Sequence, residues 1–153
     1  MSQSPPIIAV IGAGQCESSI YQLALEVGEE IAKRGAILVC GGLGGVMEAA
    51  AKGASMAGGL TVGILPGPSC NSANPYIKVP VATDMGQARN VIIAHTADGL
   101  VAVSGGAGTM SEIGHGLKIG KPIVGLKTIP NLRGVHYVDT AQEAIARIFE
   151  LLN

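Results

Sequence analysis

Five short apolar runs recur along the chain, and a stretch with helical spacing follows each of them. The runs lie at residues 7–11, 37–40, 61–65, 100–103 and 123–126. Most of them lack polar alternation, which is typical of strands buried on both faces. The helical spacing lies at residues 19–34, 46–57, 87–97, 109–119 and 140–152. Weaker apolar runs predict two further strands, at residues 79–82 and 135–138.

Strands and helices that alternate through short connections predict parallel strands joined by right-handed crossovers. We therefore expect an α/β fold, a Rossmann-like doubly wound and mostly parallel sheet with helices on both faces. The 153 residues have room for one domain of the commonest size, so we expect a single domain over residues 1–153. Residues 66–80, with four prolines, form the only long loop. Loops of that length are usually functional or mobile.

Composition argues against several classes of partner. The chain has ten Lys and Arg residues and eleven Asp and Glu residues, and the basic residues are not concentrated in any segment. We therefore expect no nucleic-acid partner. Aromatic residues make up only 3%, which removes the stacking platform of single-strand binders. The cysteines are Cys16, Cys40 and Cys70, an odd number without a Cys-x-x-Cys pair, and the histidines share no ligand spacing. We expect no metal site and a reduced, cytoplasmic setting.

Hydrophobic residues make up 48% of the chain and charged residues only 14%, against a typical charged share of about 25%. So little charge does not cover a small globule, and we expect a homodimer or homotetramer that buries part of the apolar surplus. The first six residues lack the basic segment of a signal peptide, and no apolar run approaches the ~18 residues of a membrane span. We therefore expect no membrane association.

Glycines cluster just past three of the predicted strands. The candidates are Gly12, Gly14, Gly41, Gly42, Gly44, Gly45, Gly105, Gly106 and Gly108. Loops at the carboxyl edge of a parallel sheet expose backbone N–H groups, and a helix N-terminus favours an anion. The clusters therefore predict a phosphorylated small-molecule ligand. The alternative is that these glycines only allow tight turns between strand and helix.

Two familiar nucleotide motifs are incomplete in this chain. The dinucleotide motif requires a third glycine where Glu17 stands, and the strand ending at Cys40 lacks an acidic residue for ribose. No Gly-Lys-Ser/Thr follows any glycine cluster, so the Walker loop is absent as well. We expect neither NAD nor Mg-ATP as a cofactor, and one phosphate rather than three.

Three polar residues accompany the glycine clusters. Thr109 and Glu112 have the spacing of a helix capping box, in which each side chain bonds to the other's backbone N–H. In the alternative, Thr109 holds phosphate while Glu112 faces the rest of the ligand as an acceptor or general base. Arg89 lies near the start of a predicted helix, where it is either an exposed helical residue or a bidentate clamp on an anion.

Four segments together resemble the lysine-decarboxylase-like superfamily. They are residues 40–48, residues 58–67, Arg89 and residues 105–112. Within that superfamily, residues 45–47, 65–68 and 88–90 are similar to elements of the molybdenum cofactor carrier proteins. This resemblance implies a Rossmann-like homo-oligomer that binds the phosphorylated pterin cofactor without transforming it. It adds Met47 to the binding residues and implies a molybdoenzyme or a cofactor-biosynthesis protein as partner.

A second branch of the superfamily, the Lonely Guy phosphoribohydrolases, has the motif Pro-Gly-Gly-x-Gly-Thr-x-x-Glu. Residues 104–112 are similar to it, except that Ser104 replaces the proline. This resemblance implies release of free base and ribose 5-phosphate from nucleoside 5′-monophosphates, with Arg89 and Glu112 catalytic. Asn90 stands where those enzymes have a lysine. We therefore prefer a carrier and keep the hydrolase as the alternative. Single-strand DNA-binding relatives form a third branch, which conflicts with the charge and aromatic counts.

Overall fold

A seven-stranded sheet runs through the computed structural model, which describes residues 4–153. Its strands are β1 (Ile7–Gly12), β2 (Ile37–Cys40), β3 (Thr61–Leu65), β4 (Val79–Ala82), β5 (Gly99–Val103), β6 (Ile123–Leu126) and β7 (Val135–Val138). All neighbouring pairs are parallel, in the order β4-β3-β2-β1-β5-β6-β7. The predictions of a parallel sheet and of all seven strands are confirmed. Residues 1–3, the first half of the six-residue segment that lacks signal-peptide features, lie outside the described residues.

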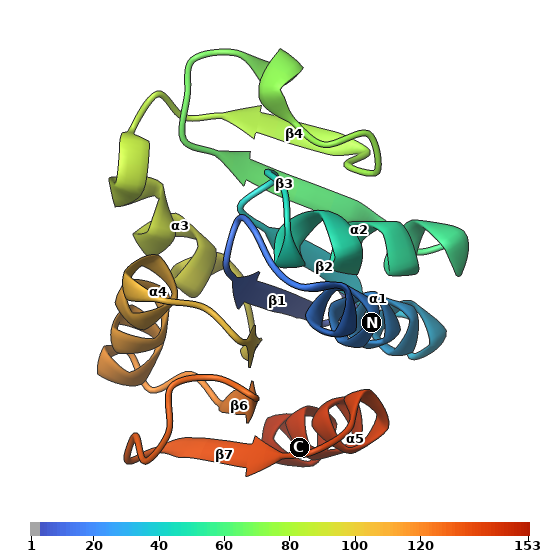
Figure 1. The fold of residues 1–153 in the computed structure, drawn as a ribbon, viewed down its shortest axis with the longest axis vertical. Coiled ribbons are helices and arrows are strands. Elements are labelled where there is room, and N and C mark those ends of the chain that lie inside the picture. The colour runs from blue at the N-terminus through green and yellow to red at the C-terminus, as the bar shows by residue number, and fades with distance from the viewer. Residues whose placement is uncertain (1–3) are drawn as a thin grey trace.

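The helices are α1 (Ser18–Lys33), α2 (Val46–Met56), α3 (Arg89–Thr96), α4 (Ala107–Lys118) and α5 (Ala141–Leu152). Short 3-10 turns add η1 (Cys70–Ser72) and η2 (Gly86–Ala88). Helices α1, α2 and α5 cover one face of the sheet, and α3 and α4 cover the other (Figure 1). The predicted helices are confirmed with ends shifted by one or two residues, except that residues 87–88 belong to η2. No helix within residues 4–153 is long and apolar enough to cross a membrane.

An aliphatic core fills both faces of the sheet, as a chain almost without aromatic residues requires. The largest fully buried side chains are isoleucines and leucines from the strands, α1, α3, α4 and α5. Two glycines bring α1 and α2 together: a Cβ on Gly28 would lie 1.9 Å from the Ala50 oxygen, and one on Gly53 equally close to the Leu25 oxygen. The two helices therefore pack backbone against backbone.

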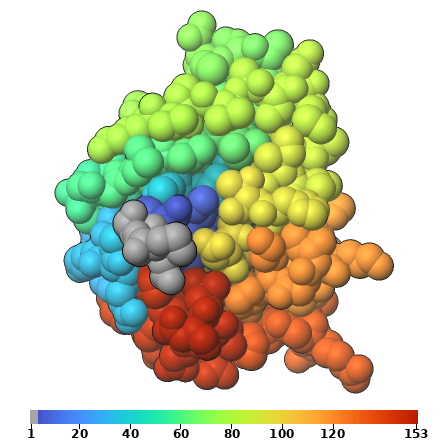
Figure 2. Space-filling view, turned by 180° about the vertical axis from the view of Figure 1, so that it is seen from behind, coloured from blue at the N-terminus to red at the C-terminus, as the bar shows by residue number. Residues whose placement is uncertain are grey.

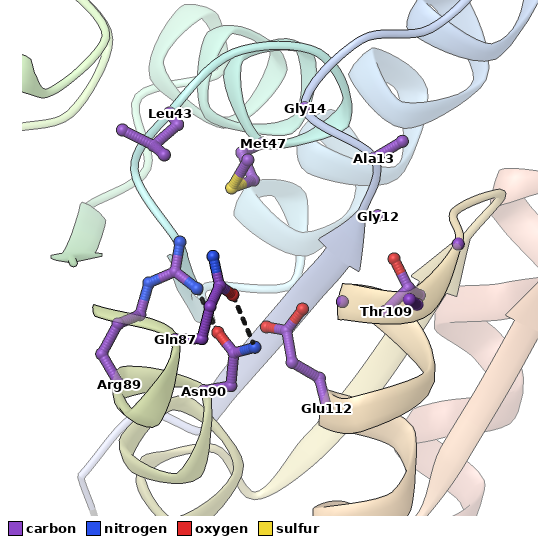
Figure 3. Close-up of a pocket in the computed structure, with 13 residues that line it drawn as sticks. Gly12, Ala13, Gly14, Leu43, Met47, Gln87, Arg89, Asn90, Thr109 and Glu112 are labelled. Atoms are coloured by element: carbon purple, nitrogen blue, oxygen red, sulfur yellow. Dashed lines mark hydrogen bonds between the residues drawn. The ribbon is translucent and has the colours of Figure 1, made fainter. Parts of the chain in front are cut away.

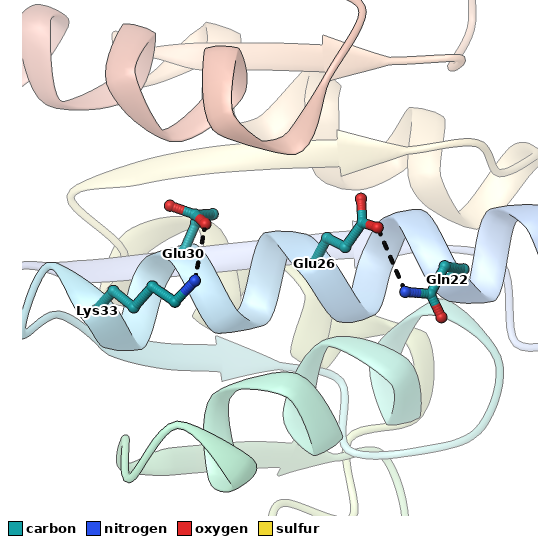
Figure 4. A network of polar contacts seen from close by, with 4 residues as sticks. All are labelled: Gln22, Glu26, Glu30 and Lys33. Atoms are coloured by element: carbon teal, nitrogen blue, oxygen red, sulfur yellow. Dashed lines mark hydrogen bonds and ion pairs between the residues drawn. The ribbon is translucent and has the colours of Figure 1, made fainter.

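The outer side of α1 is stabilised by pairs of its own residues. Gln22 Nε2 donates to Glu26 Oε1 over 3.3 Å, and Lys33 Nζ pairs with Glu30 Oε1 over 3.3 Å (Figure 4). Such surface pairs contribute only about 0.2–0.5 kcal/mol each. They mark a solvent-facing side of the helix rather than a binding site.

The winding of the chain reverses between two central strands. After β1 the chain builds β2, β3 and β4 outward on one side, and it then returns to place β5 on the other side of β1. In open α/β sheets, ligands bind beyond the carboxyl ends of the strands at this switch point. The two ends of the described chain lie away from that edge, and Pro6 and Leu152 line the same hollow. Figure 2 shows the C-terminal segment in dark red.

Candidate functional site

A pocket of about 330 Å³ opens at the carboxyl edge of the sheet, at the switch point between β1 and β5 (Figure 3). Four segments form it: the end of β1, the loop into α2, the start of α3 with η2, and the first turns of α4. Eight predicted site residues line it: Gly12, Gly14, Met47, Arg89, Gly106, Gly108, Thr109 and Glu112. The structure thus brings together residues that are separated by 100 positions in the sequence.

The other five predicted glycines do not line the pocket. They are Gly41, Gly42, Gly44, Gly45 and Gly105. At Gly45, φ is +63° and an added Cβ would lie 2.3 Å from the Ala13 oxygen, which accepts from the Val46 N–H at 3.0 Å. An added Cβ on Gly41 would lie 2.6 Å from Arg89 Nη2. Glycine at these positions lets the pocket-forming segments approach one another.

The start of α4 faces the pocket without a side-chain cap. Gly106 is the N-cap residue, and the first helical bond runs from the Met110 N–H to the Gly106 oxygen at 2.9 Å. The N–H groups of residues 107–109 have no acceptor within residues 4–153. The capping-box interpretation of Thr109 is wrong, because α4 begins two residues before it. Three free donors and the positive end of the helix dipole therefore face the pocket.

Arg89 is the first residue of α3, and it is only 5% exposed. The alternative of an exposed helical arginine is therefore wrong. Its Nε donates to the Ile64 oxygen at 2.8 Å, Nη2 to the Gly41 oxygen at 3.5 Å, and Nη1 to Asn90 Oδ1. Because a guanidinium carries five N–H groups, two remain without an acceptor in the described part of the chain. The side chain is held by the ends of β2 and β3 and still has donors for an anion.

Glu112 projects from the second turn of α4 into the same pocket and is 7% exposed (Figure 3). No hydrogen bond from its carboxyl group to another described residue is formed. Burial raises the pKa of this carboxyl group to about 7, although the Arg89 charge acts in the opposite direction. Burial also lowers the pKa of Arg89, which nonetheless stays protonated. Glu112 can therefore exchange a proton near neutral pH.

Five pocket residues were not among the predicted site residues. They are Ala13, Leu43, Gln87, Asn90 and Ala107. Asn90 Nδ2 donates to Gln87 Oε1 at 3.4 Å, so the two amides continue the chain of contacts that begins at Arg89 (Figure 3). A sequence signal existed for Ala13, Leu43 and Ala107, because each is an apolar residue inside a glycine cluster. None existed for Gln87, which reaches the pocket only through the turn of η2.

The long loop between β3 and β4 supports the pocket from outside. Asn74 is buried, and its Nδ2 donates to the carbonyl oxygens of Gly42 at 3.3 Å and Leu43 at 2.8 Å. The loop therefore holds the glycine cluster that carries Leu43. Within residues 4–153, no group of three or more His, Cys, Asp or Glu side chains lies close enough together to hold a metal ion.

A family model described as the SLOG cluster4 family matches residues 5–149. The chain belongs to the SLOG cluster4 family. This SLOG cluster4 protein is 50% identical over 138 residues to an uncharacterized protein of Archaeoglobus fulgidus, covering 90% of this chain and 91% of the other. Two solved structures are similar to this chain over nearly its whole length.

The molybdenum cofactor binding protein from the phototrophic bacterium Rippkaea orientalis matches with a TM-score of 0.94 at 32% identity, over 99% of this chain and 100% of the other. The molybdenum cofactor carrier protein of Chlamydomonas reinhardtii matches with a TM-score of 0.90 at 39% identity, over 97% and 99%. These matches confirm the predicted Rossmann-like fold and the resemblance to the molybdenum cofactor carrier proteins.

Proposed function

We propose that this SLOG cluster4 protein binds the phosphorylated pterin of the molybdenum cofactor in the pocket and carries it without transforming it. One observation carries the proposal: N–H donors that have no acceptor among residues 4–153 converge on the pocket from two elements. The start of α4 offers the N–H groups of residues 107–109, and Arg89 offers two guanidinium N–H groups. Phosphate oxygens accept from both kinds of donor. The carrier and binding proteins of similar structure support a pterin as the organic part.

The space in the pocket agrees with a small phosphorylated ligand. Its volume of about 330 Å³ falls at the lower end of the roughly 300–1,000 Å³ typical of small-molecule sites. A Cβ on Gly106 or Gly108 would meet no protein atom within 4 Å, so the ligand can approach the backbone closely there. In this proposal the protein is a cytoplasmic homodimer or homotetramer that hands its cargo to a molybdoenzyme or a cofactor-biosynthesis protein.

A second candidate function, nucleotide phosphoribohydrolysis, is favoured by Glu112, whose carboxyl group has a pKa of about 7 and forms no hydrogen bond with the other described residues. Such a group suits general acid–base catalysis. Two features count against this candidate. Asn90 removes the second cation of the hydrolase motif. Ser104, in place of the motif's proline, has a φ of +54° and donates its N–H to the Leu126 oxygen at 3.0 Å. Proline can do neither.

Two assays on the same purified protein test the proposal. In the first, the protein is mixed with released molybdenum cofactor, re-isolated, and added to a molybdenum-free apoenzyme whose recovered activity is measured. We expect transfer by the wild type, weaker loading of Arg89→Ala, and normal loading of the control Arg147→Ala on α5. In the second assay, AMP and a cytokinin monophosphate are incubated with the protein and ribose 5-phosphate is measured. Turnover of order 1 s⁻¹ that Glu112→Gln abolishes would overturn the carrier proposal.

A further inference from the structure

Glu112 is the one acidic side chain among the pocket-lining residues of the described chain. In the proposed function, the phosphate of the ligand occupies the start of the same helix. A carboxylate does not accept a hydrogen bond from phosphate oxygens and repels their charge. Its natural partners are N–H groups on the uncharged part of the ligand. Glu112 lies five positions after Ala107, which places its Cα roughly 7–8 Å along the helix from the anion end.

Donors without acceptors lie beside Glu112, on the neighbouring helix and turn. Asn90 is oriented by Arg89, because its Oδ1 accepts from Nη1, so its Nδ2 must present N–H groups. One of these goes to Gln87 Oε1 at 3.4 Å, which leaves the Gln87 NH2 group without an acceptor in the described chain. Helices α3 and α4 pack against each other, and both amides and Glu112 line the same pocket (Figure 3).

We propose that Glu112 and the Asn90–Gln87 amide pair form a reader for the 2-amino-4-oxopyrimidine edge of a ring ligand. That edge presents an amino N–H, a ring N–H and a carbonyl oxygen side by side. The two oxygens of Glu112 accept from both N–H groups, and the amide pair donates to the carbonyl oxygen. The inference rests on the proposed function, because pterins carry this edge. Guanine carries the same edge, so the experiment includes both ring systems.

The test compares ligands that differ in one group of that edge. The probes are the monophosphates of 6-hydroxymethylpterin and of 6-hydroxymethyllumazine, in which a carbonyl oxygen replaces the 2-amino group. We expect the wild type to bind the pterin about 10- to 100-fold more tightly, because the lumazine places an acceptor against the carboxylate. Glu112→Gln should reduce this ratio to within about threefold. Glu143→Gln, which removes an exposed carboxylate from α5, should leave the ratio unchanged.

Asn90→Ala provides a second measurement that does not depend on the folding of Glu112→Gln. Both probes keep the 4-oxo group, so Asn90→Ala should weaken them equally and preserve their ratio. Binding of both probes with equal affinity to the wild type would overturn the reader and leave the carrier function standing. Binding of neither probe, together with equal affinities for GMP and IMP, would overturn both. A preference for GMP over IMP without pterin binding would support the edge reader and overturn only the carrier function.

Discussion

Gly105 and Thr109 lie in contact at the entrance to α4: a Cβ added to Gly105 would stand 2.1 Å from Thr109 Oγ1. Gly105 also has a φ of +108°, a conformation that residues with a Cβ rarely adopt. Thr109 is buried and lines the pocket, whereas Gly105 does not. Gly105 therefore acts on the pocket through the position of Thr109.

Gly105→Ala should lower the free energy of unfolding by about 1–3 kcal/mol and should weaken phosphate-ligand binding as well. Both effects follow from strain at φ and from displacement of Thr109. Gly120→Ala is the matched control, because Gly120 also has a positive φ, +76°, but no atom within 4 Å of an added Cβ. Urea unfolding and ligand titration check the prediction. It fails if the two variants lose the same stability and bind ligand equally well.

Gly108→Ala should separate stability from binding. Gly108 lies in the first turn of α4, where alanine is favoured over glycine by up to about 1 kcal/mol, and its added methyl group would point into open space at the pocket. We expect thermal stability to rise while ligand affinity falls. Gly114→Ala, farther along the same helix and exposed, should raise stability alone. Unchanged affinity in Gly108→Ala would place the ligand elsewhere.

Arg89→Ala should weaken ligand binding by roughly 1.5–3 kcal/mol through the loss of charge-assisted hydrogen bonds. It also leaves the Ile64 oxygen without its donor, so the free energy of unfolding should fall too. Arg89→Lys should not restore binding, because one ammonium group cannot reproduce the planar fork that meets three acceptors. Isothermal calorimetry with a phosphorylated pterin measures the change. Full affinity in Arg89→Lys would contradict the fork geometry.

The stability of the ligand-free protein should fall between about pH 4.5 and pH 7 because of Glu112. Below its ordinary pKa of 4.5, Glu112 is protonated in the folded and unfolded states alike. Between pH 4.5 and the folded-state pKa of about 7, Glu112 ionises in the unfolded chain but stays protonated in the folded protein. The free energy of unfolding therefore falls by roughly 3 kcal/mol over this range. Of its titratable neighbours, Arg89 stays charged, and burial raises the pKa of Cys40 to about 12.

Urea unfolding at pH 5, 6, 7 and 8 measures this dependence in the wild type and in Glu112→Gln. The difference between the two proteins isolates Glu112 from the other titrating groups. We expect the variant to become the more stable protein as the pH rises. Parallel pH profiles would show that Glu112 ionises in the folded state at its ordinary pKa.

The apolar surplus predicts an oligomer in solution. Met85 and Met110 are large exposed hydrophobic residues, on the loop before η2 and on α4, and each is close in sequence to residues that line the pocket. Light scattering should give a mass at least twice the 15.4 kDa of one chain. Met110→Lys should shift the protein toward the monomer, whereas Met56→Lys, at the far end of α2, should not. A mass near 15.4 kDa that does not change with protein concentration would contradict the prediction.

Secondary structure and sheet type were readable in the sequence because they depend on local patterns. The continuous apolar runs of β1, β2, β3, β5 and β6 predict buried parallel strands, and even the weaker edge strands β4 and β7 were found. Helix α4 begins two residues before its predicted start, because Gly106 is the N-cap residue and offers no side chain that a sequence pattern would reveal. Thr109, which has the residue type of a cap, lies inside the helix instead.

Residue type alone marked Arg89, Glu112 and the glycines as candidates, since few other residues can meet an anion or exchange a proton. Only the tertiary structure decided which of them share a pocket, because strand order places Gly12 beside Gly106 and brings Arg89 between the ends of β2 and β3. Burial, which raises the pKa of Glu112, and the η2 turn that delivers Gln87 are also products of packing. Proximity and desolvation arise between segments distant in the chain, so no local pattern encodes them.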